Sequence, residues 1–413
     1  MKSKLFLFPF LILLTGMHQT VASPANEQKL AAANNGFAFK LLKQLAKDQP
    51  ITNIFISPYS AATALQMVAN GAAGQTEVEM QQVLGISGMS MEELDETSKA
   101  AADLLRANQT SVVLATANSI WYPKDNLIKS NFTDVNQRFF QATVKALDFG
   151  NPPAAEAEIN RWVNDQTHGL ITGMGNGMID SQTAVVLANA VYFKGKWLAT
   201  FDKKLTKQRS FHLSSGTNKK VPMMEMSSDF AYREGPYCQV VRLPYKSRNL
   251  AMYIFLPDRD IGLVKFLHII NGDNWRRIGI QGYENPYAGL IFNSSSGCLV
   301  LPKFKFEDTI QMEVPLKALG IKAAFDPAKA DFSGMFSGQL FLSEVQQRTF
   351  VKVDEEGTEA AAVTAVRGTY GTTHEKPPKP FQMVVDRPFL FLIEDSQTGV
   401  ILFMGVIFDP GAN

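Results

Sequence analysis

The first third of the chain carries apolar residues at the three- and four-residue spacing of amphipathic helices. This spacing over residues 37–45 predicts a helix with one buried face. Ser57-Pro58 predicts the start of a second helix, because serine is a favoured cap and proline fits the first helical position. Thr76 and Glu79 form a capping-box pattern that predicts a third helix, with Gly85 at its end.

From residue 111 onward the pattern changes to short apolar runs that are typical of strands. These runs are Ser111–Tyr122, Ala184–Phe193, Val240–Leu243, Leu250–Leu256 and, leading into a long polar segment, Thr349–Val353. Near the end of the chain, Phe389–Ile393 and Val400–Ile407 flank a polar turn and predict a hairpin too apolar to be solvated on both faces. Helices come first and strands later, without strict alternation, which predicts the α+β class. No repeat or Gly/Ser-rich linker divides the chain, so we expect one domain over residues 23–413.

Composition and charge exclude several classes of function. The 413 residues are 46% hydrophobic and include 40 basic and 39 acidic side chains, so no basic surplus is present for nucleic-acid binding. The five histidines are scattered, and no HExxH, GxSxG or P-loop spacing occurs. We therefore expect no catalysis, no cofactor and no metal site. Cys238 and Cys298 cannot form a disulfide framework, and their spacing leaves open whether they pair or remain two buried thiols.

The N-terminal residues have the pattern of a secretory signal. Lys2 and Lys4 precede an apolar run, Leu5–Leu14, and small residues follow around Ala22, which predicts a signal peptide over residues 1–22. The run is shorter than the roughly 20 apolar residues that span a bilayer. We expect a secreted protein with no membrane partner, extracellular or, in a bacterium, periplasmic.

Residues 354–380 have neither a core nor an ordinary loop pattern. Structureless loops beyond about 12–15 residues are uncommon in compact domains and are usually functional or disordered. Counted in steps of two from Thr358, one face carries only small uncharged side chains, while Glu359 and Arg367 fall on the other face. No proline interrupts residues 358–371, and Gly357 before them offers a swivel point. The pattern predicts a loop that can become a strand with one buried face.

The run from Glu355 to Ala362, Glu-Glu-Gly-Thr-Glu-Ala-Ala-Ala, resembles the hinge of an inhibitory serpin. Three other stretches resemble the family in the same order: Asn53–Ser60, Asn189–Trp197 and Asp386–Phe391. The similarity runs from about residue 30 to the end of the chain. It implies the serpin fold, with three β-sheets, eight or nine helices and an exposed reactive-centre loop over about residues 357–380.

The resemblance also implies a mechanism and a partner. A target serine protease attacks the loop as a substrate and forms an acyl-enzyme, and the cleaved loop then inserts as a strand into the large sheet before hydrolysis finishes. The protein would act as a monomer and as an inhibitor rather than an enzyme. The hinge implied by the resemblance comprises Glu355, Glu356, Gly357, Thr358, Glu359, Ala360, Ala361 and Ala362.

Further roles follow from the same resemblance. Thr358 is the first inward side chain to enter the sheet, and Glu355 pairs with Lys303 beside Trp197 at the top of the sheet. The polar cluster where the strands part comprises Ser57, Ser60, Asn189 and Gln347. Serpins usually carry His-Lys where this chain has Gln347-Arg348, and because glutamine both donates and accepts, we expect an altered but working network.

The position of the cleaved bond stays open between alternatives. The commonest serpin spacing places it at Gly371–Thr372, which suits an elastase- or subtilisin-like protease. A loop one residue shorter gives Tyr370–Gly371 and a chymotrypsin-like target, whereas counting back from the later motif favours a position near His374. Arg367 would suit a trypsin-like enzyme but lies too near the hinge for full insertion. A cysteine protease is a further target class.

Two rival interpretations remain. A non-inhibitory serpin would act as a carrier, chaperone or storage protein, but such relatives often carry bulky, charged or proline residues in the hinge, and this chain does not. A basic run could instead form a glycosaminoglycan-type patch, although isolated charge runs are usually solvated faces. That run comprises Lys203, Lys204, Lys207 and Arg209.

Overall fold

The computed structural model describes residues 22–107, 112–180, 182–278, 293–358 and 379–412. Eight α-helices lie within these ranges. They are α1 (Pro24–Asp48), α2 (Pro58–Ala69), α3 (Gly74–Leu84), α4 (Met91–Ala107), α5 (Ser130–Phe140), α6 (Pro152–Gln166), α7 (Gly262–Ile269) and α8 (Glu313–Leu319). The helix-rich first third of the chain is thus confirmed, and short 3-10 turns follow at η1 (Lys203–Leu205) and η3 (Ala323–Phe325).

The predicted helix starts have different outcomes. Ser57 caps α2 as expected, because its hydroxyl accepts a hydrogen bond from the Ser60 amide at 3.4 Å. The capping box at Thr76 and Glu79 is wrong: α3 begins earlier, at Gly74, and has no side-chain cap. These two side chains bind a distant segment instead, since the Thr76 hydroxyl accepts from the Asp331 amide and the Glu79 carboxylate accepts from the first residues of the η3 turn.

A six-stranded sheet contains three strands of 12 residues each. Its order is β10 (Phe304–Gln311), β11 (Leu342–Val353), β4 (Val185–Lys196), β2 (Val112–Pro123) and β3 (Thr143–Leu147), and β12 (Gly357–Thr358) pairs with β4 beside this path. The neighbours β11 and β4 run parallel, whereas β12 pairs antiparallel with β4. A strand placed between β11 and β4 in the direction of β12 would be antiparallel to both.

The remaining strands form a nine-stranded network. Its order is β1 (Ile54–Ile56), β15 (Val400–Ile407), β14 (Phe389–Asp395), β8 (Leu250–Pro257), β7 (Cys238–Pro244), β6 (Asn218–Glu234), β9 (Asn293–Pro302) and β13 (Phe381–Val384), with β5 (Lys207–His212) paired to β6. Two of the three expected sheets are continuous here, because the long strand β6 pairs with β5 and β9 along most of its length and with β7 at its end. The predicted hairpin is confirmed as β14 and β15, and every residue of both strands is buried.

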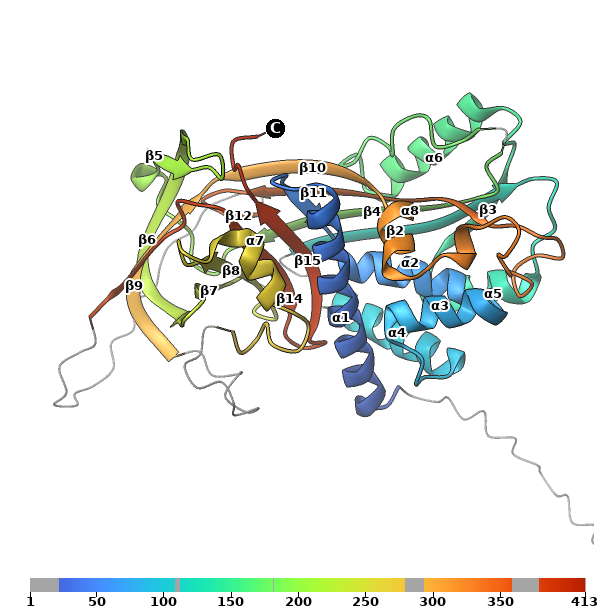
Figure 1. Cartoon of the computed structure of the whole chain (residues 1–413), viewed down its shortest axis with the longest axis horizontal. Helices are drawn as coiled ribbons and strands as arrows, with labels where there is room; N and C mark the ends of the chain where they lie inside the picture. The colour runs from blue at the N-terminus through green and yellow to red at the C-terminus, as the bar shows by residue number, and fades with distance from the viewer. Residues whose placement is uncertain (1–21, 108–111, 181, 279–292, 359–378, 413) are drawn as a thin grey trace, which may run out of the picture.

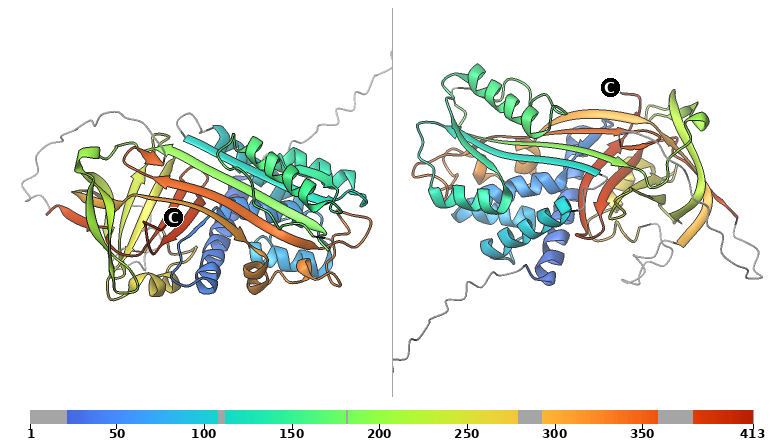
Figure 2. Two further views of the ribbon diagram at one scale, coloured as in Figure 1. Left: turned by 90° about the horizontal axis from the view of Figure 1, so that it is seen from above. Right: turned by 180° about the vertical axis from the view of Figure 1, so that it is seen from behind.

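Helices cover the two faces of the six-stranded sheet. Figure 1 shows α2–α5 on one side of the long strands and α6 on the other. The outer face packs side chains of β2 and β4, such as Trp121 and Tyr192, against α6 and the segment that follows it. Seen from above in Figure 2, α6 lies over one end of the sheet, and the end that leads to β12 extends beyond it.

The structure bears on two further points, the pairing of the cysteines and the presence of a membrane-spanning helix. Cys238 is buried, Cys298 is half-buried, and both are free thiols, so the pairing that the sequence left open is not present. Of the helices in the described ranges, none combines the length and the apolar character needed to cross a membrane.

Candidate functional site

The segment after β11 reverses direction at a tight turn. The Asp354 amide donates to the Gly357 carbonyl at 2.9 Å, and the Gly357 amide donates back to the Asp354 carbonyl at 3.3 Å. After this turn, Gly357 lies opposite Lys196 and Thr358 opposite Gly195 on β4. The first two residues beyond the turn are therefore already paired as a strand on β4.

The turn requires glycine because two backbones come very close together. Gly357 has φ of +147°, and a Cβ placed on it would lie 2.1 Å from the Gly195 carbonyl oxygen. Gly195, which lies opposite Thr358, is constrained from another side, since a Cβ on it would lie 2.8 Å from the Tyr245 ring. Glycine at 357 lets β12 approach β4 without displacing backbone atoms, and glycine at 195 leaves room for the Tyr245 ring.

Thr358 lies in a fully buried position at the top of the sheet. Its side chain points inward, with 0% exposure, and its hydroxyl is 2.9 Å from the Tyr245 hydroxyl. Burial raises the pKa of Tyr245 far above its ordinary value, so the phenol stays neutral and its proton is available for this bond. The Tyr245 ring stacks on Trp197 at 4.6 Å between centroids, and the Trp197 indole NH donates to the Asp354 carbonyl at 3.0 Å.

The predicted ion pair between Glu355 and Lys303 is confirmed. Lys303 Nζ is 2.7 Å from Glu355 Oε2, and the Thr206 hydroxyl donates to Glu355 Oε1, also at 2.7 Å. Only 6% of the Glu355 side chain is exposed. Burial alone would raise the pKa of this carboxyl, but the hydrogen bonds from Lys303 and Thr206 outweigh burial and hold the pKa below its ordinary value.

Glu356 is held beside this pair. Its carboxylate forms an ion pair with Lys203, and its carbonyl accepts from the Trp197 amide at 3.0 Å. Two members of the basic run are therefore engaged in ion pairs, Lys203 with Glu356 and Arg209 with Glu225. Lys204 and Lys207 are exposed, which agrees with a solvated face.

A second set of polar side chains lies farther from the hinge along the sheet, between α2 and the strands β4 and β11. The Gln347 amide nitrogen donates to the Ser57 carbonyl at 2.9 Å and to Asn189 Oδ1 at 2.6 Å, and its amide oxygen accepts from the Ser57 amide at 2.8 Å. Asn189 in turn donates to the Ser60 hydroxyl and to Asn118. The expected altered network is present, with glutamine using both its donor and its acceptor.

Gln347 and Asn189 also occupy directly opposite positions on the parallel strands β11 and β4. Their hydrogen bond spans the line along which a further strand would enter. Gln347, Asn189, Ser57 and Ser60 are all at most 3% exposed, so opening the sheet here would break buried hydrogen bonds. The structure thus gathers the six predicted sheet residues into two groups, with Trp197 and Lys303 near the hinge turn and the other four below.

Part of the predicted site lies outside the described residues. This part comprises Glu359, Ala360, Ala361 and Ala362 of the hinge and the alternative cleavage positions Arg367, Tyr370, Gly371, Thr372 and His374. Sequence reasoning missed Tyr245, Thr206 and Gly195, which contact the described half of the hinge. Only Gly195 carried a usable signal, because it is a glycine inside a strongly apolar strand.

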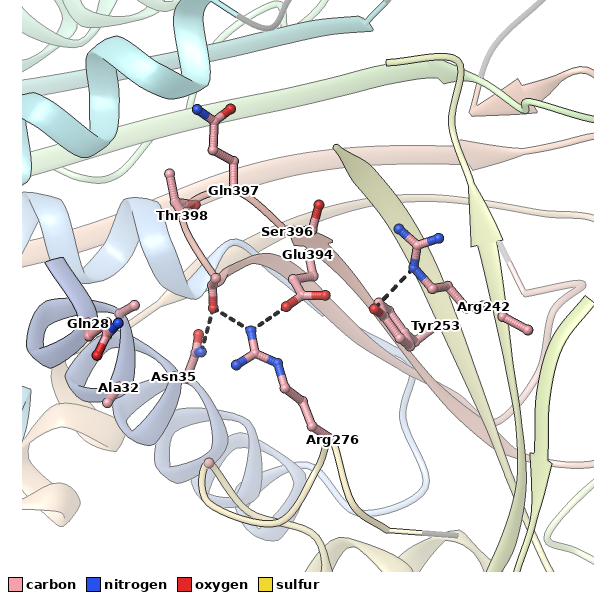
Figure 3. Close-up of a pocket in the computed structure, with 14 residues that line it drawn as sticks. Gln28, Ala32, Asn35, Arg242, Tyr253, Arg276, Glu394, Ser396, Gln397 and Thr398 are labelled. Atoms are coloured by element: carbon pink, nitrogen blue, oxygen red, sulfur yellow. Dashed lines mark hydrogen bonds and ion pairs between the residues drawn. The ribbon is translucent and has the colours of Figure 1, made fainter. Parts of the chain in front are cut away.

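A cavity of about 640 Å³ lies away from the hinge. Figure 3 shows that α1 forms one wall and the β14–β15 hairpin another. Arg276 forms an ion pair with Glu394 and donates to the Gly399 carbonyl at 3.0 Å, and Asn35 donates to the same carbonyl at 2.9 Å (Figure 3). Two charged side chains of the cavity, Arg276 and Glu394, are therefore already paired with each other.

Comparison with known proteins agrees with this architecture. The family model described as "Serpin (serine protease inhibitor)" matches residues 32–410. The chain is 37% identical to Serpin B6 of Macaca fascicularis, over 92% of this chain and 99% of that protein. It is 33% identical to the human leukocyte elastase inhibitor, over 93% of this chain and 100% of that protein.

A solved structure gives the same result for the fold. Human thyroxine-binding globulin, in complex with thyroxine, superposes with a TM-score of 0.82 at 27% identity and covers 94% of this chain and 100% of its own. The chain belongs to the serpin family, which is described as a family of serine protease inhibitors, and it has the serpin fold.

Proposed function

We propose that this protein is a secreted inhibitor of serine proteases that traps its target by inserting its own cleaved loop as a strand. The observation that carries the proposal is β12. Gly357 and Thr358 are paired antiparallel with β4, next to the parallel strands β11 and β4 that would flank a longer strand. Insertion of the loop would extend a strand that has already begun.

The dimensions and energies are sufficient for such a trap. The 14 residues from Thr358 to Gly371 would span about 45 Å as a strand, at roughly 3.3 Å each. A ladder of about a dozen new hydrogen bonds, each with a net value of about 0.5–1.5 kcal/mol, contributes on the order of 10 kcal/mol. The uncut protein would therefore be held in its fold kinetically rather than as its most stable state.

The same contacts would keep the uncut protein from inserting its loop too early. A strand advancing below Thr358 would have to separate Gln347 from Asn189 and release their buried hydrogen bonds. These bonds resist opening until cleavage frees the loop to replace them with a full ladder. We propose Gly371–Thr372 as the cleaved bond and an elastase- or subtilisin-like enzyme as the target, and secretion through the N-terminal signal.

Incubation with purified proteases tests the proposal. Elastase-, subtilisin-, chymotrypsin- and trypsin-like enzymes are each mixed with the protein, and at least one is expected to form a complex that survives boiling in detergent. Mass spectrometry of the released C-terminal peptide would then locate the cleaved bond. If every protease either ignores the protein or only digests it, the inhibitory proposal is lost.

A carrier function is the second candidate, and the cavity in Figure 3 favours it. Thyroxine-binding globulin demonstrates that a protein of this fold can bind a small hormone. The hinge favours inhibition over this alternative, because Gly357 and Thr358 are small and Thr358 is already accommodated inside the sheet. Digestion without complex formation, together with saturable binding of thyroxine, would reverse this preference.

A further inference from the structure

The helix α4 is attached to the helical layer by a face that is largely polar. A helix on the surface of a globular protein usually buries a continuous apolar stripe. The buried residues of α4 are instead two apolar ones, Leu94 and Leu105, and three polar ones, Asp95, Thr97 and Ser98. Figure 1 shows α4 on the side of α2 that faces away from the long strands. The attachment of α4 therefore depends on how its buried polar groups are partnered.

Hydrogen bonds between side chains connect α4 with α2 and α1. The Ser98 hydroxyl donates to Gln66 Oε1 at 3.2 Å, and the Gln66 amide nitrogen donates to Asn34 Oδ1 at 3.1 Å. Three residues before Ser98, on the same face of α4, Asp95 Oδ1 accepts from the Asn70 amide nitrogen at 2.7 Å. Hydroxyl and amide groups stay neutral, so within this set only the Asp95 carboxyl changes its charge with pH.

The Asp95 carboxyl lies in the interior without a counter-charge. The residue is 4% exposed, and in the part of the chain that the structure describes it forms no ion pair. Burial is the largest effect on its ionisation and raises the pKa of Asp95 to about 7, while the Asn70 hydrogen bond acts against burial. Glu96, the next residue of α4, is an acidic neighbour and raises the pKa of Asp95 further.

The helices around Asp95 contain no other side chain that ordinarily titrates near pH 7. The helix α2 has no acidic or basic residue, and none of α1, α2, α4 and α5 contains a histidine. On α4 itself, hydrogen bonds from Ser90 lower the pKa of Glu93, and hydrogen bonds from Lys99 and Arg106 lower the pKa of Asp103. The other charged residues of α4, and those of α1 and α5, which pack against it, are Glu92, Glu27, Lys29, Lys40, Lys43, Lys47, Asp48, Asp134 and Arg138.

A carboxyl that is buried only while α4 is attached links the attachment to protons. Detached from α2, the carboxyl would meet water and regain its ordinary pKa of 3.8, so the attached helix binds the proton more tightly. The attachment is therefore strongest below about pH 3.8, weakens as the pH rises, and stops weakening above the folded-state pKa. We propose that Asp95, Asn70, Gln66 and Ser98 form a proton-dependent attachment of α4, firm in acidic surroundings and looser at neutral pH. This role is separate from protease inhibition.

Hydrogen exchange of the full chain tests the attachment. Exchange of the α4 amides is followed by mass spectrometry at pH 5, 6, 7 and 8, and protection factors are obtained by correcting for the intrinsic pH dependence of amide exchange. We expect the protection of α4 to fall by about tenfold for each pH unit between pH 5 and about pH 7 and then to level off, because detachment releases one proton.

Two variants of the same helix control the experiment. Asp95→Asn keeps an oxygen that accepts from Asn70 but cannot ionise, so its α4 protection should remain at the wild-type pH 5 level up to pH 8. Glu92→Gln removes an exposed carboxylate from the first turn of α4 and should follow the wild-type pH dependence. In wild type, the carbon-13 NMR signal of the Asp95 carboxyl, assigned by its loss in Asp95→Asn, should titrate near pH 7.

Several outcomes would overturn the proposal. Equal α4 protection at pH 5 and pH 8 in wild type is one, and an equal fall in Asp95→Asn and wild type is another. A parallel fall in α6, on the other side of the six-stranded sheet, would mean that the whole molecule loosens rather than α4 alone. If Asp95→Asn does not fold, the carboxyl signal of the wild type decides, because titration near pH 4 would mean that Asp95 is not held in its buried, protonated form.

Discussion

Thr358 combines two properties that the first residue of an entering strand needs. It is small enough to lie between the sheet and Tyr245 with no exposed surface, and its hydroxyl has a partner there. A buried hydroxyl without a partner would oppose entry, because its desolvation would be uncompensated. Tyr245 therefore provides a prepared site for this side chain at the point where the proposed mechanism would open the sheet.

Replacing Thr358 tests that role. Arginine at this position would bring a charge into a site with a neutral phenol and stacked rings, at a cost of several kcal/mol. Thr358→Arg should therefore stall insertion and turn the inhibitor into a substrate, with the yield of detergent-stable complex reduced about tenfold or more. Thr358→Ser keeps the hydroxyl and should inhibit like wild type, and an unchanged complex yield for Thr358→Arg would remove Thr358 from the mechanism.

Glu355 gives the hinge turn a dependence on pH. The pKa of its carboxyl is lowered from the ordinary value of 4.5, so the folded protein binds this proton more weakly than the unfolded chain does. Its contribution to stability is therefore complete above about pH 4.5 and is lost as the pH falls through the folded-state pKa.

The variant Glu355→Gln should show this dependence. Hydrogen bonds to a charged group contribute about 1.5–3 kcal/mol, so at pH 7 the variant should melt roughly 2–4 °C below wild type at a fixed scan rate. The gap should narrow as the pH is lowered below 4.5, because the wild-type carboxyl becomes protonated as the pH passes through its folded-state pKa. Glu307→Gln removes an exposed ion pair with Arg348 and serves as the control. A gap that stays constant over this range would contradict the assignment.

At the scale of elements, local sequence patterns predicted the structure correctly where that structure depends only on neighbouring residues. The cap at Ser57 and the hairpin of β14 and β15 depend on neighbouring residues, and both are confirmed. Thr76 and Glu79 carry an equally good local pattern, but their side chains bind residues near positions 322–331, which a local rule does not include. Tertiary contacts there override the capping pattern.

In the candidate site, too, some residues were predicted from the sequence and others were not. Glu355 and Lys303 were found through the family resemblance, whereas Tyr245 was not, because its role needs Thr358, which is 113 positions away in the sequence. β13 was also missed: its four residues are too few to show a period, and its partner β9 lies far upstream in the chain. When the role of a residue depends on packing against a distant segment, the residues next to it in the sequence do not reveal that role.

At the scale of the whole molecule, the described residues at the two ends of the loop are anchored in different sheets. Thr358 starts a strand on β4, and β13 ends the loop on β9, in a different sheet network. While both anchors hold, the parallel strands β11 and β4 remain hydrogen-bonded to each other through Gln347 and Asn189 and lack the antiparallel neighbour that their geometry accepts. In the proposed mechanism, cutting the chain between these anchors would free the loop to enter the sheet without removing any residue.

Cleavage within the loop should therefore raise the stability of the molecule. The roughly dozen new hydrogen bonds of an inserted strand contribute on the order of 10 kcal/mol, which for a domain of this length raises the melting temperature by on the order of 10 °C. The measurement compares calorimetric scans of uncut protein and of protein nicked by a protease that does not remain bound. Nicked Thr358→Arg is the matched control and should show a smaller rise, because its loop is cut but the buried arginine opposes its entry into the sheet. Equal melting temperatures for nicked and uncut wild type would mean that the strand begun by β12 does not grow, and the proposed trap would then have no driving force.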